Sequence, residues 1–233
     1  MSYLLPSSAT ATSSRPTTIT LRDGRTLAYV ECGDVEGTPV FHFHGHPGSR
    51  LEALIADKEA RSVGVRLIGI DRPGMGFSDF KRGRQILDWP DDVVELADAL
   101  SINRFSVQGA SGGGPYALAC AYRLADRLLA CGIIAGLGPI HRLGTDGMML
   151  TNRLQFALAR RTPWLVQILL WAYLGRYRKY VDDEEMLDLL GVKMGQGLQG
   201  TTNDTDVPKL YIRETVEAFR QSSRGATYHA SPF

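Results

Sequence analysis

The sequence predicts an α/β fold built on a mostly parallel sheet, followed by an inserted helical cap. In the first 140 of the 233 residues, apolar β-prone runs alternate with helix-forming runs, as in a sheet covered by helices. Loops rich in Gly and Pro follow the carboxyl ends of two of these runs. After Pro139 no further strand-like run appears, and residues 150–222 have the pattern of successive helices.

The opening segment predicts antiparallel strands. Residues 17–30 read TTITLRDGRTLAYV and contain two β-prone runs on either side of Asp23-Gly24, a dipeptide typical of tight hairpins. Residues 38–48 and 65–76 predict a third and a fourth strand, each ending in a loop of Gly and Pro. The two loops therefore both follow the carboxyl end of a strand.

A helix is expected to begin at Asp88, an N-cap residue type that is followed by Trp89-Pro90. Apolar residues then recur at i, i+3, i+4 and i+7, which predicts one buried stripe: Val93, Leu96, Ala97 and Leu100. Three acidic residues are expected to lie off this stripe: Asp92, Glu95 and Asp98.

Three further elements complete the predicted sheet. Residues 104–111 predict a short strand, residues 114–126 a helix, and residues 128–138, LLACGIIAGLG, another buried strand. These assignments divide the chain into a mobile tail, a core, a helical cap and a C-terminal tail: residues 1–16, 17–140, 141–225 and 226–233.

The composition argues against several kinds of partner. Lys and Arg (26) almost balance Asp and Glu (25), and no basic run is long enough to bind nucleic acid. The apolar segment 163–175 is too short to span a bilayer. Its basic flanks would suit a helix at a membrane interface, but we favour a cap helix that lines an acyl or aromatic pocket, so membrane contact is not expected. The three cysteines lack CxxC spacing and lie in apolar stretches that predict burial. The N-terminal segment does not have the pattern of a secretory signal, so a reducing, cytoplasmic location is expected. The oligomeric state stays open.

One serine lies among four glycines in VQGASGGGPY, residues 107–116. The stretch contains G-x-S-x-G, the nucleophile elbow, in which a strained turn between strand and helix presents the serine hydroxyl. Gly109 and Gly113 leave room where the strand and the helix pack most closely. The pattern occurs by chance in about one chain in ten of this length, but here an apolar run precedes it and a helix-forming run follows it. Ser111 is therefore the predicted nucleophile.

A second interpretation of this stretch is a dinucleotide loop. GASGGGP is similar to the G-x-x-x-G-x-G loop of short-chain dehydrogenases, which would make the chain an NAD(P)-dependent oxidoreductase. Pro115 stands in place of the last glycine, and no Lys has Tyr four positions earlier, as that family's catalytic pair requires. We therefore expect no cofactor and keep this as the third alternative.

Three histidines alternate along the predicted third strand, at His42, His44 and His46. On a strand they would share one face, which raises the possibility of a metal site. The stretch is similar to the H-x-H-x-D-H motif of metallo-β-lactamase-type hydrolases, but it lacks the Asp of that motif. The sequence therefore predicts no metal.

The same stretch, His44-Gly45-His46-Pro47, resembles the H-G-x-P oxyanion loop of α/β-hydrolases. The order and spacing of this loop, the DRPGMGFSD loop, the helix DWPDDVVELADAL and the G-x-S-x-G elbow resemble that family over residues 17–139. The resemblance implies a mostly parallel sheet with its second strand antiparallel, and a helical cap inserted after the sixth strand. It also implies a serine-based site beneath the cap, with the N–H groups of His46 and Gly112 as oxyanion donors.

The resemblance further implies a triad acid after a seventh strand and a histidine after an eighth, neither of which is visible. The last strands are expected to be missing, as in a chain truncated at its C-terminus, which would leave the apolar strand at residues 128–138 as an unprotected edge. His229 is the only histidine beyond the cap and a formal candidate for the base, although nothing in the terminal stretch positions it. The resemblance therefore implies a serine hydrolase for a small apolar or acyl substrate, namely a small or medium carboxylic ester or a related acyl compound, with activity impaired by loss of the triad acid and histidine. The alternative is a non-catalytic remnant that binds apolar ligands or nothing.

Overall fold

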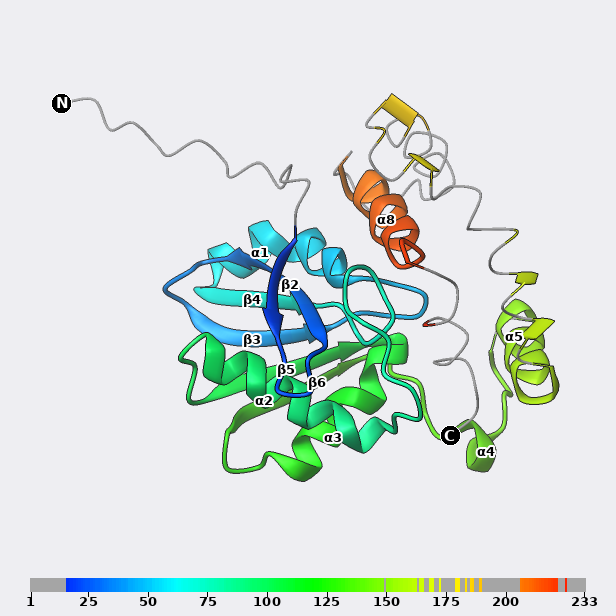
Figure 1. The fold of residues 1–233 in the computed structure, drawn as a ribbon, viewed down its shortest axis with the longest axis horizontal. Helices are drawn as coiled ribbons and strands as arrows, with labels where there is room; N and C mark the ends of the chain where they lie inside the picture. The colour runs from blue at the N-terminus through cyan, green and yellow to red at the C-terminus, as the bar shows by residue number, and fades with distance from the viewer. Residues whose placement is uncertain are drawn as a thin grey trace.

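The chain folds around a twisted, mostly parallel sheet with helices on both faces (Figure 1). The computed structural model describes residues 16–148, 150–162, 206–221 and 225, together with isolated positions between 164 and 189. The predicted tail of residues 1–16, except residue 16, lies outside this part of the chain. His229 and the predicted tail of residues 226–233 lie outside it too.

The sheet has six strands in the described residues, in the order β1-β2-β4-β3-β5-β6. Their bounds are β1 Thr17–Thr20, β2 Thr26–Gly33, β3 Thr38–Phe43, β4 Val65–Ile70, β5 Phe105–Ala110 and β6 Leu128–Ile134. β2 pairs antiparallel with β1 and with β4, whereas β4, β3, β5 and β6 are parallel to one another. The predicted mostly parallel sheet with an antiparallel second strand is confirmed.

The hairpin predicted at Asp23-Gly24 joins β1 and β2. Thr20 pairs with Thr26, and Gly24 has φ +84°, a conformation that glycine adopts without steric cost. The local sequence was sufficient here because both the turn chemistry and the flanking alternation favour the same structure.

Helices cover the two faces of the sheet separately. The 3-10 segment η1 (Arg50–Ala56) and helix α1 (Asp57–Ser62) lie on one face, while α2 (Trp89–Ala99) and α3 (Gly114–Arg123) lie on the other (Figure 1). A small cluster of Cys32, Ala53, Ala60 and Leu67 fills the α1 side, and a larger apolar core fills the side of α2 and α3. This layering is what an α/β sheet with two buried faces requires.

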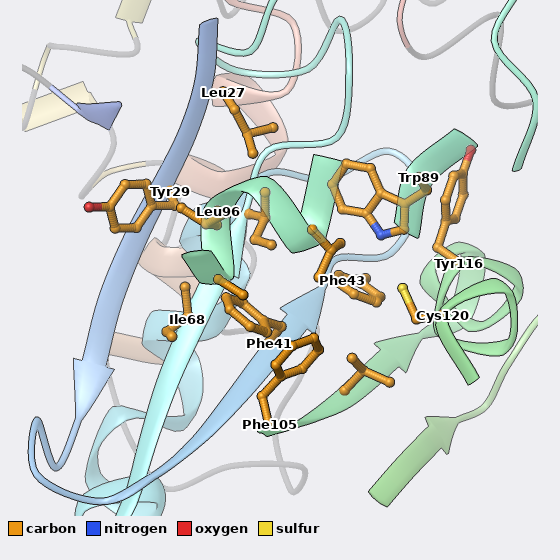
Figure 2. Close-up of a cluster of buried hydrophobic side chains, with 14 of the residues drawn as sticks. Leu27, Tyr29, Phe41, Phe43, Ile68, Trp89, Leu96, Phe105, Tyr116 and Cys120 are labelled. Carbon is orange, nitrogen blue, oxygen red and sulfur yellow. The ribbon is translucent and has the colours of Figure 1, made fainter. Parts of the chain in front are cut away.

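Aromatic side chains form the centre of the larger core (Figure 2). Phe41 packs edge-to-face on Phe105, with ring centroids 4.8 Å apart. Trp89 makes the same kind of contact with Phe43 at 5.3 Å and with Tyr116 at 5.9 Å. The first contact joins β3 to β5, the second holds the start of α2 against Phe43, the last residue of β3, and the third joins the starts of α2 and α3.

The helix α2 has the predicted buried apolar face, but two acidic residues near its start differ from the prediction. Val93, Leu96 and Ala97 are buried as predicted. Asp92 was expected to be off the buried face but is itself buried, because Arg25 from the hairpin pairs with it at 2.6 Å. Asp88 does not cap α2: its carboxylate accepts the Gln85 N–H at 2.9 Å, within the preceding 3-10 turn η2 (Ile86–Asp88).

The strand β6 was predicted to be buried, and this is wrong. It is shorter than predicted and forms the edge of the sheet in the described residues, with Leu129 to Ile134 exposed. Cys131, also expected to be buried, is exposed with its strand, whereas Cys32 and Cys120 are buried. An apolar run predicts a strand, but only the neighbouring elements decide whether it is covered.

Beyond β6 the described elements are helices: α4 (Ile140–Leu143), α5 (Leu150–Arg161) and α8 (Asp206–Glu217). The helix α8 packs on η1 (Figure 1). Just after it, Ala218 and Phe219 cluster with Met75 from the loop after β4. In the described residues, no helix is long and apolar enough to cross a membrane.

Candidate active site

Ser111 lies at the turn from β5 to α3, in the one-turn 3-10 segment η3 (Ser111–Gly113). Its φ is +47°, a conformation that costs a non-glycine residue roughly 1–3 kcal/mol and persists only where the surroundings enforce it. Its side chain is exposed, and its carbonyl accepts the Leu137 N–H at 2.9 Å from the segment after β6. The structure therefore holds this serine in a strained turn at the surface of the sheet's carboxyl edge.

The glycines around Ser111 are required by close backbone contacts. A Cβ on Gly109 would lie 2.8 Å from Gly114 N, where the strand and the helix cross. A Cβ on Gly113 would come 2.8 Å from the carbonyl carbon of Phe43 and 2.9 Å from the oxygen of His44, on the neighbouring strand and its loop. A side chain at Gly109 would push β5 away from the start of α3, and one at Gly113 would separate the elbow from the end of β3 and its loop.

The loop after β3 runs directly beside the elbow. A Cβ on Gly112 would lie 2.8 Å from His46 Cβ and 3.5 Å from the His46 backbone nitrogen. A Cβ on Gly45 would lie 3.7 Å from Ser111 Cβ. The three residues that the sequence singled out, Ser111, Gly112 and His46, are thus neighbours, because β3 and β5 are adjacent parallel strands whose carboxyl ends meet at one edge.

Arg72 is a central residue of this site that no sequence motif marked as functional. Its side chain is fully buried, its Nη2 donates to Gly45 O at 2.6 Å, and its Nη1 donates to Gly112 O at 2.9 Å. Its guanidinium also lies over the Tyr116 ring, 4.7 Å from the centroid. The sequence places Arg72 in the loop after a predicted strand, but only the structure shows that this strand, β4, is parallel and adjacent to β3, so that the two loops meet.

His44 completes the contacts around Arg72. His44 Nδ1 lies 2.8 Å from Gly45 O, and its Nε2 lies 3.2 Å from the backbone N of Arg72. One neutral tautomer, with the proton on Nδ1, satisfies both contacts. Burial and the nearby Arg72 charge lower the pKa of His44 well below its ordinary value, so the ring stays neutral.

A carboxylate holds the other side of the loop. Glu52 Oε2 accepts the Gly45 N–H at 2.7 Å, and Glu52 Oε1 lies 3.2 Å from Nε2 of His42. The other ring nitrogen of His42, Nδ1, lies 3.1 Å from the Gln108 amide nitrogen. Both ring nitrogens of His42 are therefore occupied, and the side chain helps to order the loop beside Ser111.

These three histidines are poorly suited to act as a general base. His42 and His44 use both ring nitrogens in the contacts described above, and burial together with Arg72 and Arg84 lowers the pKa of His46 to about 3. A base works best when its pKa is near the working pH. His229, the candidate for the base beyond the predicted cap, lies outside the described residues.

Buried charges connect the site to α8. Arg50 Nη1 contacts Asp71 and Glu217, each at 2.8 Å, and Asp71 Oδ1 accepts the Arg50 N–H at 2.6 Å. Glu214 is also buried and accepts the Ser49 N–H at 3.0 Å. Burial raises the pKa of Glu214 well above its ordinary value of 4.5, with the nearby negative charge of Glu52 as a second cause.

The alternating histidines do not assemble a metal centre in the part of the chain that the structure covers. Across the described residues, no group of three His, Cys, Asp or Glu side chains is placed to hold a metal ion. Burial raises the pKa of the Cys32 thiol to about 12, which keeps it protonated and a poor ligand.

Comparisons with solved structures agree on the fold. An α/β-hydrolase fold protein from Nakamurella multipartita matches with a TM-score of 0.58 and 22% identity over 93% of this chain and 73% of its own. A candidate acyltransferase from Salmonella enterica matches with a TM-score of 0.59 and 21% identity, over 91% and 69%. A candidate aryl esterase from Burkholderia cenocepacia gives 0.57 and 20%, over 91% and 71%. No family model and no curated protein matches the sequence.

The chain has the α/β-hydrolase fold. This conclusion rests on the order and direction of the strands and on the fold of these structures, whose sequence identity is too low to carry substrate or mechanism from one protein to another.

Proposed function

We propose that this chain is a serine hydrolase for a small or medium carboxylic ester or a related acyl compound, with Ser111 as its nucleophile. One observation carries the proposal: Ser111 is exposed in a strained turn between β5 and α3, and the next residue, Gly112, lies against the backbone of His46. This is the arrangement in which two backbone N–H groups can share one oxygen of an acyl substrate.

In the proposed reaction, Ser111 Oγ forms a bond to the ester carbonyl carbon while its hydroxyl proton passes to a base. The electron pair of the carbonyl π bond moves to the oxygen, and the N–H groups of His46 and Gly112 donate to this oxyanion. When the carbonyl re-forms, the bond to the alkoxide breaks and the alkoxide leaves as the alcohol after gaining a proton. Water then attacks the acyl-serine in the same way and releases the carboxylic acid.

We further propose that turnover by these 233 residues is weak. None of His42, His44 and His46 suits the role of base, and loss of a catalytic histidine costs about 10⁶-fold in kcat in a serine protease of unrelated fold. The remaining oxyanion donors still favour slow acylation. The names of two proteins that share the fold, a candidate aryl esterase and a candidate acyltransferase, are in keeping with acyl chemistry.

The test uses the whole chain, a fluorophosphonate probe and p-nitrophenyl butyrate. Ser111→Ala should abolish probe incorporation, and mass spectrometry should place the adduct on Ser111. A matched control is Ser101→Ala: Ser101 is also exposed and also has a positive φ, +58°, but it lies after α2, away from the elbow. That variant should label like the wild type.

Two results would count against the proposal. If the probe reacts equally with wild type and with Ser111→Ala, Ser111 is not the nucleophile, and a non-catalytic binder of apolar ligands becomes the better account. If the wild type turns over ester at ordinary enzyme rates, at or above ~1 s⁻¹, and loses that activity in His229→Ala, then His229 is a working base and the predicted weak turnover is wrong.

A further inference from the structure

We infer that Arg72 is a positioning residue that orients the His46 N–H group toward the oxyanion. The inference rests on the proposed function of Ser111, which it deepens by naming a side chain that keeps one of the two donors in place. Arg72 touches neither Ser111 nor the substrate in this account, and it acts only through the peptide that joins Gly45 to His46.

The argument begins with the geometry of one peptide. Gly45 O and His46 N belong to one planar trans peptide group. Because the group is planar, the direction of the Gly45 carbonyl also fixes the direction of the His46 N–H. Gly45 O accepts Arg72 Nη2 at 2.6 Å and lies 2.8 Å from His44 Nδ1. A carbonyl oxygen has two lone pairs, and these two contacts use both of them. The peptide group therefore cannot rotate without losing a buried hydrogen bond.

The preceding peptide is held as well. The Gly45 N–H donates to Glu52 Oε2 at 2.7 Å, so Gly45 is fixed at its nitrogen by a carboxylate and at its carbonyl by a guanidinium. Both contacts are charge-assisted and therefore stronger than hydrogen bonds between neutral groups. The residue immediately before the proposed donor is thus held on both sides.

Arg72 also sets the distance between the two donors. Its Nη1 donates to Gly112 O at 2.9 Å, in the residue whose own N–H is the second proposed donor. One rigid guanidinium therefore contacts the loop after β3 and the elbow after β5 at the same time. The charge also polarises the Gly45–His46 amide and strengthens its N–H as a donor.

A lysine cannot replace this contact, because an ammonium group lacks the planar fork that reaches two acceptors in fixed directions. The buried site reinforces the requirement: the guanidinium lies against the Tyr116 ring, and burial lowers the pKa of Arg72 to about 10, which leaves it charged at neutral pH. In Arg72→Lys the positive charge should therefore remain, but one of the two contacts, with Gly45 O or with Gly112 O, should be lost and the His46 N–H should become less firmly held.

The sequence allows this peptide to be observed directly. Gly45-His46 is the only Gly-His pair in the chain, so labelling Gly with ¹³C at the carbonyl and His with ¹⁵N selects one signal in an HNCO spectrum. In the wild type the Gly45 carbonyl carbon should resonate downfield, as expected for an oxygen that accepts two hydrogen bonds. A position typical of a free carbonyl would overturn the inference without any variant.

Variants test the consequence. Arg72→Lys keeps the charge, and Arg72→Met keeps much of the side-chain volume. Either variant should shift the Gly45–His46 signal and slow fluorophosphonate labelling of Ser111 by about tenfold. This loss is smaller than the roughly 100-fold expected when an oxyanion donor itself is deleted. Arg50→Lys is the matched control, because Arg50 is also buried but contacts Asp71 and Glu217. It should lower Tm without moving the signal or the labelling rate.

The outcomes separate the two claims. If Arg72→Lys leaves both the Gly45–His46 signal and the labelling rate as in the wild type, or if Arg50→Lys changes them equally, Arg72 has no specific positioning role. Failure of wild-type Ser111 to react would refute the proposed function, whereas the HNCO signal tests the contact of Arg72 with the Gly45–His46 peptide by itself.

Discussion

Replacing Gly112 by Ala adds one methyl group at the contact between the elbow and the loop of His46. The new carbon would lie 2.8 Å from His46 Cβ, and unstrained carbon atoms approach to about 3.5–4.0 Å. The loop must therefore move by roughly 1 Å or the elbow must distort. Overpacking of this kind costs about 1–3 kcal/mol, which for a chain of this size lowers Tm by roughly 2–4 °C per kcal/mol.

The functional effect of Gly112→Ala should be larger than the effect on stability. The Ala variant keeps its backbone N–H, but a misplacement of about 1 Å in a catalytic arrangement can cost on the order of 100-fold in rate. The assay is the second-order rate of fluorophosphonate labelling at Ser111, measured beside thermal unfolding.

Gly132→Ala is the control for this experiment. A Cβ on Gly132, in β6, would lie 3.6 Å from Gln108 Cβ, an ordinary contact, so labelling and Tm should change little. Wild-type labelling and Tm in Gly112→Ala would refute the close contact between Gly112 and His46 on which the proposed oxyanion site depends.

Three further predictions concern stability. The Tm of Glu214→Gln should rise relative to that of the wild type as the pH increases from about 5 to about 8. Folding raises the pKa of the Glu214 carboxyl above its ordinary value of 4.5, so the folded state binds this proton more tightly than the unfolded state does. The stability that this gives the wild type is complete below pH 4.5 and is lost as the pH rises through the raised pKa, whereas Gln does not titrate. A Tm difference that does not change with pH would contradict this. Leu96→Ala, at a fully buried position, should cost about 2–5 kcal/mol in denaturant unfolding. The exposed Leu118→Ala should stay within about 0.5 kcal/mol, and equal costs would show that the core is misassigned. Arg25→Met should cost about 3 kcal/mol, because it leaves the buried carboxylate of Asp92 without its partner; most of that loss should disappear when Asp92→Asn is combined with it, and a loss that persists would argue against the pair.

The fold was predictable where local signals were strong and mutually consistent. Asp23-Gly24 has the turn chemistry of a hairpin, and the spacing of Val93, Leu96 and Ala97 defines a buried helical face. The order of the motifs also predicted which loops follow the carboxyl ends of the parallel strands. Errors arose where a partner distant in sequence decides the outcome: Asp92 is buried because Arg25 is beside it.

The candidate site was predictable only in part, for a similar reason. Ser111 and Gly112 belong to a local turn motif, and His46 to a local loop motif, so each was visible from its own sequence neighbours. Arg72 and Glu52 contact the loop through pairings between separate elements. No periodicity or turn signal marks a side chain whose role depends on which strands become adjacent.

The sequence by itself determined the alternation of strands and helices, the hairpin, and the serine turn, because these depend on backbone preferences and apolar spacing within short windows of chain. The apolar run of β6 by itself favours burial, but the exposure of the strand depends on whether another element covers the edge of the sheet. Tertiary structure alone decided the position of Arg72, whose charge is tolerated in a fully buried place because the carbonyls of Gly45 and Gly112 and the Nε2 atom of His44 accept hydrogen bonds from its guanidinium. Burying a charge is favourable only when such partners converge from several elements, and that convergence exists only in the folded chain.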